Sequence, residues 1–456
     1  MHLFVALVLT ATPVSVSLTG FPFVKQKPDF CGEAVVEMAL GRLGRHVTQD
    51  DVFNASGLDP LEGRGVWTNE LATSLRRLGV EPGKVWYRVD PKDAAAQLDA
   101  QWSALHADLV AGQPSIVCMH YDASPKTTEH FRLITGYDAA RDEVIYQEPA
   151  IDDGADRRMK RDDFLALWTF KPAKDRWMVI RLRLPPGAEV APPTFTAPDP
   201  ATLSQHVQAR KAVLPKGTTL VWEKPFLVIG DEQPETVRRR AKDVVRWCRD
   251  LLLKDFFLEA PSTLHEVWVL KDAPSYQRVS RELFNTNPET PYGYYLARQR
   301  ALVMNIRPGY GTLTHELVHP FMDHAWSRVP AWLNEGVASL FEFPYEHEGH
   351  LKGRINWRLP ALQRGLSAKA VPSFKTLTHL SDSAFYEDPD GVHYAAARYL
   401  CFWLQEKGLL TTFVRRALEL QDEDATGFRA LTEVLGADPD TKRTEWETYV
   451  KALSRS

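Results

Sequence analysis

Cysteine is scarce in this sequence, which has 456 residues and four cysteines, Cys31, Cys118, Cys248 and Cys401. So few cysteines in so long a chain exclude a scaffold held together by disulfide bonds. Cys248 and Cys401 could still form one bridge within the C-terminal half, and buried free thiols are the alternative.

The sequence also lacks an excess of charge. Its formal net charge is −4, with both signs mixed along the chain. This balance gives no electrostatic reason to expect nucleic acid or an anionic membrane surface as a partner. The apolar stretch Leu3 to Ala11 is too short to span about 30 Å of hydrocarbon as a helix. We therefore expect no nucleic-acid partner and no integral membrane segment.

The N-terminal stretch has the order of a signal peptide. Residues 3–11 are apolar apart from Thr10, and small residues follow as far as Ser17. This order predicts a signal peptide over residues 1–17 and hence a secreted or cell-envelope protein. The first residues contain no lysine or arginine, so a buried N-terminal strand of a cytoplasmic protein is the alternative.

Length and proline distribution predict two domains. A chain of 456 residues with 44% hydrophobic content is too long for one ordinary core and long enough for two. Six prolines fall between positions 185 and 200 without apolar periodicity, which predicts an extended spacer. We expect a first domain over residues 18–184, a linker over 185–202 and a second domain over 203–456.

Both domains are predicted to be α+β. The first is helix-rich up to Val110 and strand-rich over residues 115–184, and the second turns helical to its end after Ala395. Earlier in the second domain the pattern predicts a strand over 218–229, a helix over 235–256, a strand over 266–270 and a strand over 298–306.

A short motif in the second domain has the spacing of a metal site. His315 and His319 belong to the sequence His-Glu-Leu-Val-His and lie one helical turn apart, so both imidazoles can reach one ion. Glu316 lies beside that helix face as a candidate general base. Glu335, in Leu-Asn-Glu-Gly on a following amphipathic segment, is the candidate third ligand.

The ligand set predicts a hydrolytic zinc centre. Two neutral imidazoles and one carboxylate leave a fourth position open on a Zn2+ ion, where the metal can activate water. Two surface histidines on an ordinary helix are the alternative. Pro320 directly follows His319, and because it lacks an N–H and crowds the carbonyl of Glu316, we expect it to end the helix early.

From about Leu220 to Ser456 the sequence resembles the gluzincin metallopeptidases of the peptidase MA-like group. The resemblance rests on Tyr-Gly-Tyr-Tyr (292–295), the segment 311–319, Pro-Ala-Trp-Leu-Asn-Glu-Gly (330–336) and Tyr-Ala-Ala-Ala-Arg-Tyr-Leu (394–400). It implies a thermolysin-like fold with a helical C-terminus and an edge strand, here residues 298–306, that pairs with extended peptide. It also implies a tyrosine that stabilises the oxyanion: Tyr394, with Tyr386 as the second choice and a core-facing aromatic as the alternative.

A second set of reactive residues lies near the N-terminus. Cys31 precedes apolar residues at helical spacing and should open a helix, whose N-terminal dipole stabilises a thiolate. His130 begins a strand over 130–138, and the segment 143–149 should form its hairpin partner and bring Glu148 to the imidazole. The predicted roles are nucleophile, base and orienter, with the Gln26 amide as an oxyanion donor.

Residues 21–184 resemble the C39 family of papain-like cysteine peptidases through Gln26, Cys31-Gly32, Gln-Pro-Ser-Ile-Val (113–117), His130 and Gln-Glu-Pro (147–149). That family has aspartate before the closing proline, where this chain has Glu148. Gln147 could therefore orient the histidine instead. A helix start with an unrelated histidine and glutamate is one alternative, and a papain-like domain that only binds peptides is another.

Together these patterns predict a secreted peptidase with two domains. A zinc endopeptidase should follow a papain-like cysteine peptidase domain, and peptides or proteins should be the substrates. The alternatives are a first domain that only binds peptide or cell-wall stem peptide, or one that acts as an amidase on cell-wall material. The sequence identifies neither the substrate nor self-processing.

Overall fold

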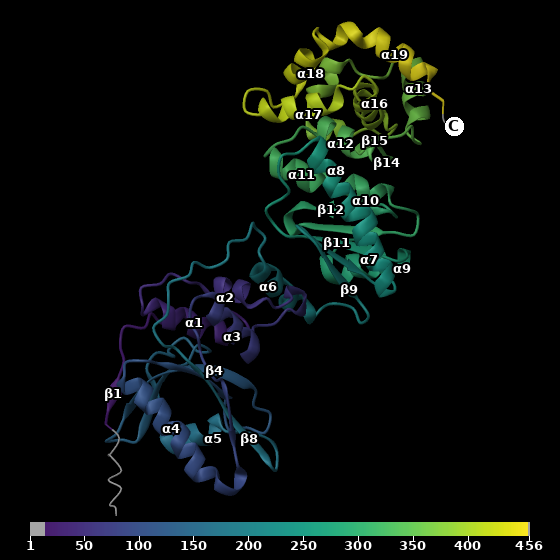
Figure 1. The fold of residues 1–456 in the computed structure, drawn as a ribbon. Coiled ribbons are helices and arrows are strands. Elements are labelled where there is room, and N and C mark those ends of the chain that lie inside the picture. Colours follow the sequence, from purple (N-terminus) through teal and green to yellow (C-terminus); the bar gives the residue numbers. More distant parts are fainter. Residues whose placement is uncertain (1–13, 455–456) are drawn as a thin grey trace, which may run out of the picture. The chain divides into compact units, whose positions relative to one another are not determined.

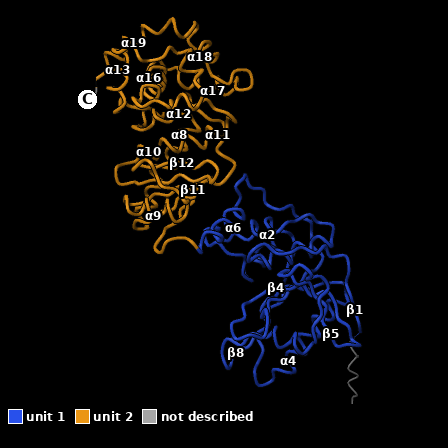
Figure 2. The backbone as a smooth tube through the Cα atoms, turned by 180° about the vertical axis from the view of Figure 1, so that it is seen from behind, with its two compact units in different colours: residues 1–212 blue, residues 213–456 orange. Residues whose placement is uncertain are grey.

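The computed structural model describes residues 14–454 and divides the chain into two compact units, residues 1–212 and 213–456 (Figure 2). Each unit combines helices with a β-sheet, which confirms the α+β prediction. The predicted signal-peptide core, Leu3 to Ala11, lies outside the described residues. Within the described range, no helix is long and apolar enough to cross a membrane.

The first unit is built on an antiparallel sheet with the strand order β2-β8-β3-β4-β5-β6, to which β1 and β7 add at β4 and β8 (Figure 1). The strands are β1 Val16–Ser17, β2 Trp86–Val89, β3 Ser115–His120, β4 Glu129–Asp138, β5 Glu143–Gln147, β6 Arg157–Lys160, β7 Phe170–Ala173 and β8 Arg176–Arg183. The helices are α1 Cys31–Gly41, α2 Gln49–Ser56, α3 Thr68–Arg77, α4 Ala94–Val110, α5 Arg161–Trp168 and α6 Pro200–Lys211.

Two hydrophobic cores lie on the two faces of this sheet. Residues of α1, α2 and α3 pack with alternate residues of β3 and β4, including Cys118 and Phe131. On the other face, α4 and α5 pack against the intervening residues, such as Met119 and Ile134. Because side chains alternate along a strand, neighbouring residues of β4 face different cores. This alternation decides where the predicted histidine points.

The start of the described chain is part of the sheet. Val16 pairs with Tyr137 and Ser17 with Gly136, and the N–H of Leu18 donates to the carbonyl of Thr135 over 2.9 Å. A cut near Ser17 would remove this short strand. The signal peptide stays a prediction.

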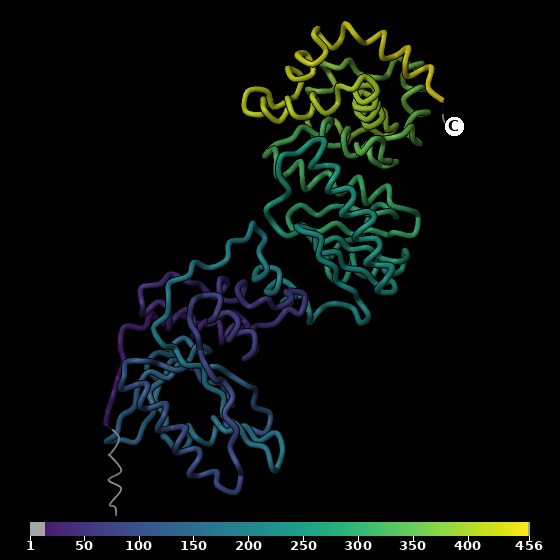
Figure 3. Tube along the Cα trace, viewed as in Figure 1, coloured from purple at the N-terminus to yellow at the C-terminus, as the bar shows by residue number. Residues whose placement is uncertain are grey.

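The proline-rich segment, predicted to be an extended spacer, contacts the first unit. Arg45 donates to the carbonyl of Val190 over 3.4 Å, and Gly79 leaves no room for a Cβ beside Ala188. Figure 3 traces the following residues to α6. This helix buries Ala201, Leu203, Ser204 and Val207 within the first unit. The first unit therefore extends to residue 212, ten residues beyond the predicted end of the linker at 202.

The second unit contains a mixed five-stranded sheet with the order β12-β13-β11-β10-β9. Its strands are β9 Thr219–Glu223, β10 Phe226–Gly230, β11 His265–Leu270, β12 Gly293–Leu296 and β13 Ala301–Asn305. The separate hairpin consists of β14 Pro344–His347 and β15 His350–Gly353.

Two strand predictions for this sheet were wrong in part. The segment 218–229 was expected as one strand, but it turns at Lys224-Pro225 into the hairpin β9–β10, because proline cannot donate to a strand ladder. The segment 298–306 does contain a strand, β13. However, β13 lies between β12 and β11, so the edge strand is β12 and not the segment that we expected.

Helices make up the rest of the second unit: α7 Pro234–Arg240, the π-helical segment η3 Ala241–Arg246, α8 Trp247–Asp255, α9 Ala273–Phe284, α10 Gly311–Glu316, α11 Val318–Ala325, α12 Ala331–Leu340, α13 Leu359–Ser367, α14 Phe374–Thr378, α15 Asp382–Tyr386, α16 Val392–Glu406, α17 Leu410–Glu419, α18 Phe428–Leu435 and α19 Arg443–Ala452. The helix predicted over 235–256 and the helical C-terminus after Ala395 are confirmed.

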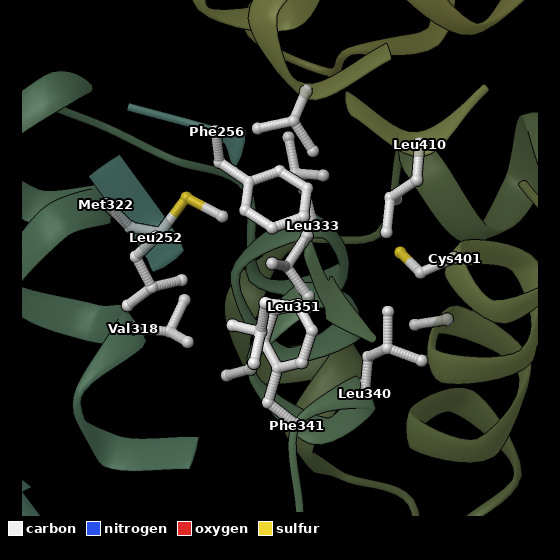
Figure 4. Close-up of a cluster of buried hydrophobic side chains, with 14 of the residues drawn as sticks. Leu252, Phe256, Val318, Met322, Leu333, Leu340, Phe341, Leu351, Cys401 and Leu410 are labelled. Carbon is white, nitrogen blue, oxygen red and sulfur yellow. The ribbon is translucent and has the colours of Figure 1, made fainter. Parts of the chain in front are cut away.

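One core joins these helices, and Figure 4 shows part of it. Side chains from α8, α11, α12, α16 and α17 meet there, including Leu252, Val318, Leu333, Cys401 and Leu410. Helices α12 and α16 approach closely at Gly336, where an added Cβ would lie 3.1 Å from the sulfur of Cys401. All four cysteines are free thiols, so Cys248 and Cys401 form no bridge.

Candidate functional site

The His-Glu-Leu-Val-His motif spans two consecutive helices. Helix α10 ends at Glu316, Leu317 interrupts the helix, and α11 begins at Val318. The break therefore lies before Pro320, and the chain is helical again from Val318 through Ala325. Pro320 falls in the first turn of α11, where a missing N–H costs no helical hydrogen bond. The expectation of a helix that stops at the proline was therefore wrong.

The predicted ligands come together. One donor atom each from His315, His319 and Glu335 lies within 4.8 Å of the others, and all three residues are buried. His315 Nε2 is 3.2 Å from Glu335 Oε2. Glu335 reaches the histidines because α12 packs against both α10 and α11. One residue from each of α10, α11 and α12 thus contributes to the same point.

One hydrogen bond selects which nitrogen of His319 faces that point, and a carboxylate lies near the outer nitrogen of His315. Asn334 Oδ1 lies 2.9 Å from His319 Nδ1, which leaves Nε2 for the convergence point. Glu342 Oε1 lies 3.7 Å from His315 Nδ1. Neither Asn334 nor Glu342 was predicted from the sequence as a neighbour of the candidate ligands. Asn334 precedes Glu335 directly, and that adjacency was the available signal.

These residues fit a zinc ion. Donors at about 2.0–2.1 Å in a tetrahedral zinc site lie roughly 3.3 Å from one another, and His315 Nε2 and Glu335 Oε2 are 3.2 Å apart. Glu335 Oε2 and His315 Nδ1 are buried without a hydrogen-bond partner. A buried carboxylate oxygen without a partner is costly unless a cation completes it. The donor set of two imidazoles and a carboxylate is one that zinc accepts.

The charges of the site favour an ionised ligand and a proton-accepting neighbour. Burial alone would raise the pKa of Glu335, but the nearby imidazole of His315 and the charge of His319 outweigh burial and hold this pKa far below its usual range. Burial raises the pKa of Glu316, partly opposed by the two histidines. A carboxyl group with a raised pKa exchanges its proton closer to neutral pH.

Both candidate tyrosines bind Glu335. The hydroxyl of Tyr386 donates to Glu335 Oε1 over 2.8 Å, and Tyr394 also hydrogen-bonds this carboxylate. Burial and the neighbouring carboxylate raise the pKa of Tyr394 beyond its ordinary range, so it stays a hydrogen-bond donor. The predicted oxyanion role of either tyrosine stays a prediction.

A cleft gives access to these residues. It has a volume of about 790 Å3 and is lined by His315, Glu316, Glu342, Arg358 and Tyr394, with Tyr292 and Trp357 at its wall. This volume lies within the roughly 300–1,000 Å3 of ordinary ligand pockets. The arrangement therefore combines a possible metal site with room for a substrate.

In the first unit Cys31 opens α1 as predicted. Its sulfur accepts a hydrogen bond from the backbone N–H of Phe131, and the residue is partly buried. Burial, together with the charges of Glu33 and Asp29, raises the pKa of Cys31 to about 12. The helix N-terminus was expected to stabilise a thiolate, but this environment favours the neutral thiol.

His130 and Glu148 also meet as predicted. His130 Nε2 lies 2.5 Å from Glu148 Oε1, and Glu148 Oε2 accepts from Arg132 Nε over 2.6 Å. Gln147 instead donates to Asp156 over 2.8 Å, so Glu148 and not Gln147 contacts the imidazole. Burial alone would raise the pKa of Glu148, but His130 and Arg132 outweigh it and lower this pKa.

The structure does not join Cys31 to His130. Across residues 14–454, no hydrogen bond links the thiol to the imidazole. His130 pairs with Met119, which belongs to the core under α4 and α5, whereas Phe131 belongs to the core under α1. Strand alternation therefore turns the imidazole away from the face that carries Phe131.

The surroundings of Gln26 leave its predicted role untested. Its backbone N–H donates to the carbonyl of Pro149 over 2.9 Å, while its side-chain Oε1 is buried without a partner. The cleft beside Cys31 is lined by further residues that the sequence analysis did not single out, among them Asp29, Arg64, Trp67 and Glu129.

Comparisons with known proteins bear on the first unit. Residues 18–173 match the Peptidase_C39 like family. That match covers most of the first unit and does not reach the second. No curated protein matches the chain.

Two solved structures are similar to this region at low identity. The peptidase domain of Streptococcus ComA, described as a bifunctional ABC transporter involved in quorum sensing, is 17% identical; the alignment covers 37% of this chain and 100% of that domain, with a TM-score of 0.26. A double glycine motif protease from an AMS/PCAT transporter, solved with its leader peptide, is 16% identical over 37% of this chain and 99% of its own, with a TM-score of 0.24.

Proposed function

We propose that the chain is a peptidase with two domains whose second unit hydrolyses peptide bonds with a zinc ion held by His315, His319 and Glu335. The convergence of these three donors within 4.8 Å, with a buried unpartnered carboxylate oxygen among them, carries the proposal. A gluzincin-like fold for this unit is part of the same proposal, since the candidate ligands come from packed helices, the two histidines from α10 and α11 and the carboxylate from α12.

When bound, zinc would act as a Lewis acid on water and on the substrate carbonyl. Glu316 would accept a proton from the attacking water and deliver it to the leaving amine nitrogen, as its raised pKa suits. Asn334 would hold the imidazole of His319 in orientation through Nδ1. Tyr394, at the wall of the cleft, would donate a hydrogen bond to the developing oxyanion.

The proposed substrate is a peptide or unfolded protein in the cleft. Strand β12 is the edge of the sheet and contacts α10, so its free backbone groups could pair with an extended chain. We also propose that the protein is secreted or located in the cell envelope, with cell-wall peptide as one substrate class.

The test measures metal and reaction together. Purified full-length protein is analysed for metals, and its turnover of an unstructured peptide is measured before and after treatment with a chelator. We expect close to one zinc per chain, loss of turnover with the chelator and recovery on adding zinc. Protein without bound metal that still cleaves the peptide after chelation would contradict the proposal.

For the first unit the family match suggests peptidase activity. The mechanism would be attack by the thiolate of Cys31, with His130 as acid and base and Glu148 as its orienter. This mechanism requires the imidazole of His130 to reach the thiol of Cys31. Among the described residues, the imidazole instead contacts Glu148 and the ring of Tyr121.

A second candidate function for this unit is peptide binding without cleavage. The raised pKa of Cys31 and its missing bond to His130 favour it. Assaying Cys31→Ala and Glu316→Gln on one set of peptides, including cell-wall amides, separates the two. If Cys31→Ala leaves all cleavage intact, the first unit binds; if it abolishes cleavage of some peptides or amides, the unit is an enzyme.

A further inference from the structure

A second pocket adjoins the cleft of the second unit. It is lined by residues of the β14–β15 hairpin and the segment after it, including Tyr345, Arg354 and Ile355. It shares Glu342 and Trp357 with the metal cleft. A substrate chain that lies across His315 and Glu316 can therefore continue into this pocket without leaving the protein surface.

The pocket carries a cation that no carboxylate neutralises. In the part of the chain that the structure describes, the guanidinium of Arg354 has no salt bridge; it lies 4.6 Å from the ring centre of Tyr345 and 5.6 Å from that of Phe343. Arg354 is exposed. Stacking on two rings fixes the direction of the guanidinium but leaves its N–H groups free to donate.

In the described part of the chain, neither carboxylate of the lining forms a salt bridge with Arg354. Glu342 is already paired with other residues. Its Oε1 accepts a hydrogen bond from Arg358 Nη2 over 2.6 Å, and its Oε2 accepts one from Asn356. Arg398 is fully buried, donates only to backbone carbonyls, one of them that of Arg354, and keeps Nη1 without a partner.

Glu406 also lines the pocket, where it accepts a hydrogen bond from Gln405 over 3.1 Å. Among the charged groups that line the pocket, Glu342 is thus paired with Arg358, and within residues 14–454 no salt bridge joins Glu406 to Arg354. An exposed guanidinium without a salt bridge can bind an anionic group, and a carboxylate is the anion that peptides carry.

We propose that this pocket is a subsite for a carboxylate of the substrate peptide, which Arg354 binds beside the exposed ring of Trp357. The inference rests on the proposed peptidase function of the second unit and adds a substrate class to it: peptides with a carboxylate a few residues from the bond that is cut. That carboxylate can belong to an aspartate or glutamate side chain or to a free C-terminus.

Binding to the full-length Glu316→Gln variant, loaded with zinc, tests the subsite without cleavage. Four fluorescent peptides differ only in one internal residue, Glu or Gln, and in a free or amidated C-terminus. Fluorescence anisotropy gives the dissociation constants. We expect the carboxylate-bearing peptides to bind about tenfold more tightly, as a charged hydrogen bond in a partly exposed site provides. The peptides that differ in the internal residue test whether the pocket binds a side-chain carboxylate. The peptides that differ at the C-terminus test whether it binds a free C-terminal carboxylate.

The variant Arg354→Gln should reduce this preference to near unity. Arg328→Gln, an exposed arginine outside both pockets, is the matched control and should keep the preference. Circular dichroism and zinc content verify that each variant is folded. An unchanged preference in Arg354→Gln, or no preference in the parent protein, would overturn the subsite.

Failure of the peptidase proposal has a different signature. If the protein holds no zinc and cuts no peptide but the Arg354-dependent preference is present, the pocket is a peptide-binding site and the hydrolytic function is wrong. If zinc and cleavage are present but the four peptides bind equally, the peptidase stands and the subsite does not.

Discussion

The two units hold their candidate groups in different ways. In the second unit, two ligands and the proposed base lie within five consecutive residues, and the third ligand lies on the next helix. In the first unit Cys31 and His130 are about a hundred residues apart, and they share no hydrogen bond. A site fixed by helical spacing is determined by short-range geometry, whereas a site made across a sheet depends on which face each strand residue takes.

The electrostatic surroundings of the candidate groups also differ between the two units. In the second unit, histidines lower the pKa of the ligand Glu335 and so favour the charged form that binds a metal. In the first unit, burial and two carboxylates raise the pKa of Cys31 and oppose the charged form that attacks a carbonyl. The surroundings thus favour the charged form of Glu335 in the second unit and the neutral form of Cys31 in the first.

The largest expected effect is on the second unit. Glu316→Gln keeps the shape of the side chain but cannot move a proton, so turnover of peptide should fall about a thousandfold while zinc content stays unchanged. Glu282→Gln, which alters an exposed glutamate on α9, is the control and should retain activity. If turnover is unchanged in Glu316→Gln with zinc bound, Glu316 is not the general base. The contrast between the two units would then be lost, because neither would have an identified base.

The next effect concerns the reactivity of Cys31. With a pKa of about 12, its alkylation by iodoacetamide at pH 7 should be about a hundredfold slower than that of the same cysteine in urea. Because the thiolate fraction grows tenfold per pH unit below the pKa, the rate should keep rising above pH 9. Mass spectrometry of the peptide that contains Cys31 measures both rates. Rapid labelling at pH 7 would show an activated thiol and would make the two units alike.

A smaller effect should appear in the stability of the first unit. Burial raises the pKa of Glu33 to about 8, while the unfolded chain keeps the ordinary value of 4.5. The folded state therefore binds the proton more tightly, and this contribution is complete below pH 4.5 and lost as the pH rises through 8.

Lowering the pH from 7 to 5 should thus favour the wild-type protein over Glu33→Gln by about 2 kcal/mol in free energy of unfolding. Urea unfolding at both pH values measures it, with Glu189→Gln as an exposed control. If Glu33→Gln and the wild type respond equally to pH, Glu33 is ionised in the folded state.

The smallest effect is expected from a group that only orients a ligand. Asn334→Ala removes the partner of His319 Nδ1 and should weaken zinc binding about tenfold. Competition with a chromophoric chelator measures the affinity, and Asn287→Ala, an exposed position, serves as control. Equal zinc affinity in both variants would mean that helix packing alone orients His319.

Local patterns predicted much of this molecule. The predicted candidate ligands lie together in the structure, and the predicted hairpin brings Glu148 to His130. Both depend on residues that are close along the chain or joined by one turn. Sequence could not reveal that β12 shields β13 from the sheet edge, or that His130 and Phe131 belong to different cores. Strand order and sheet face are set by packing of distant segments, for which one sequence carries no direct signal.

Helix α6 changes where the chain can be divided. The buried apolar residues of α6 pack beside α2 and η1 (Pro60–Glu62) and form one wall of the first unit. At the start of α6, the N–H of Ala201 donates to the side chain of Asn54. A shortened chain that stops at Leu184 would leave this wall open to water and would tend to aggregate. One that stops at Ala212 keeps the wall covered, so the stretch 213–218, before β9, is the place to separate the halves for independent study.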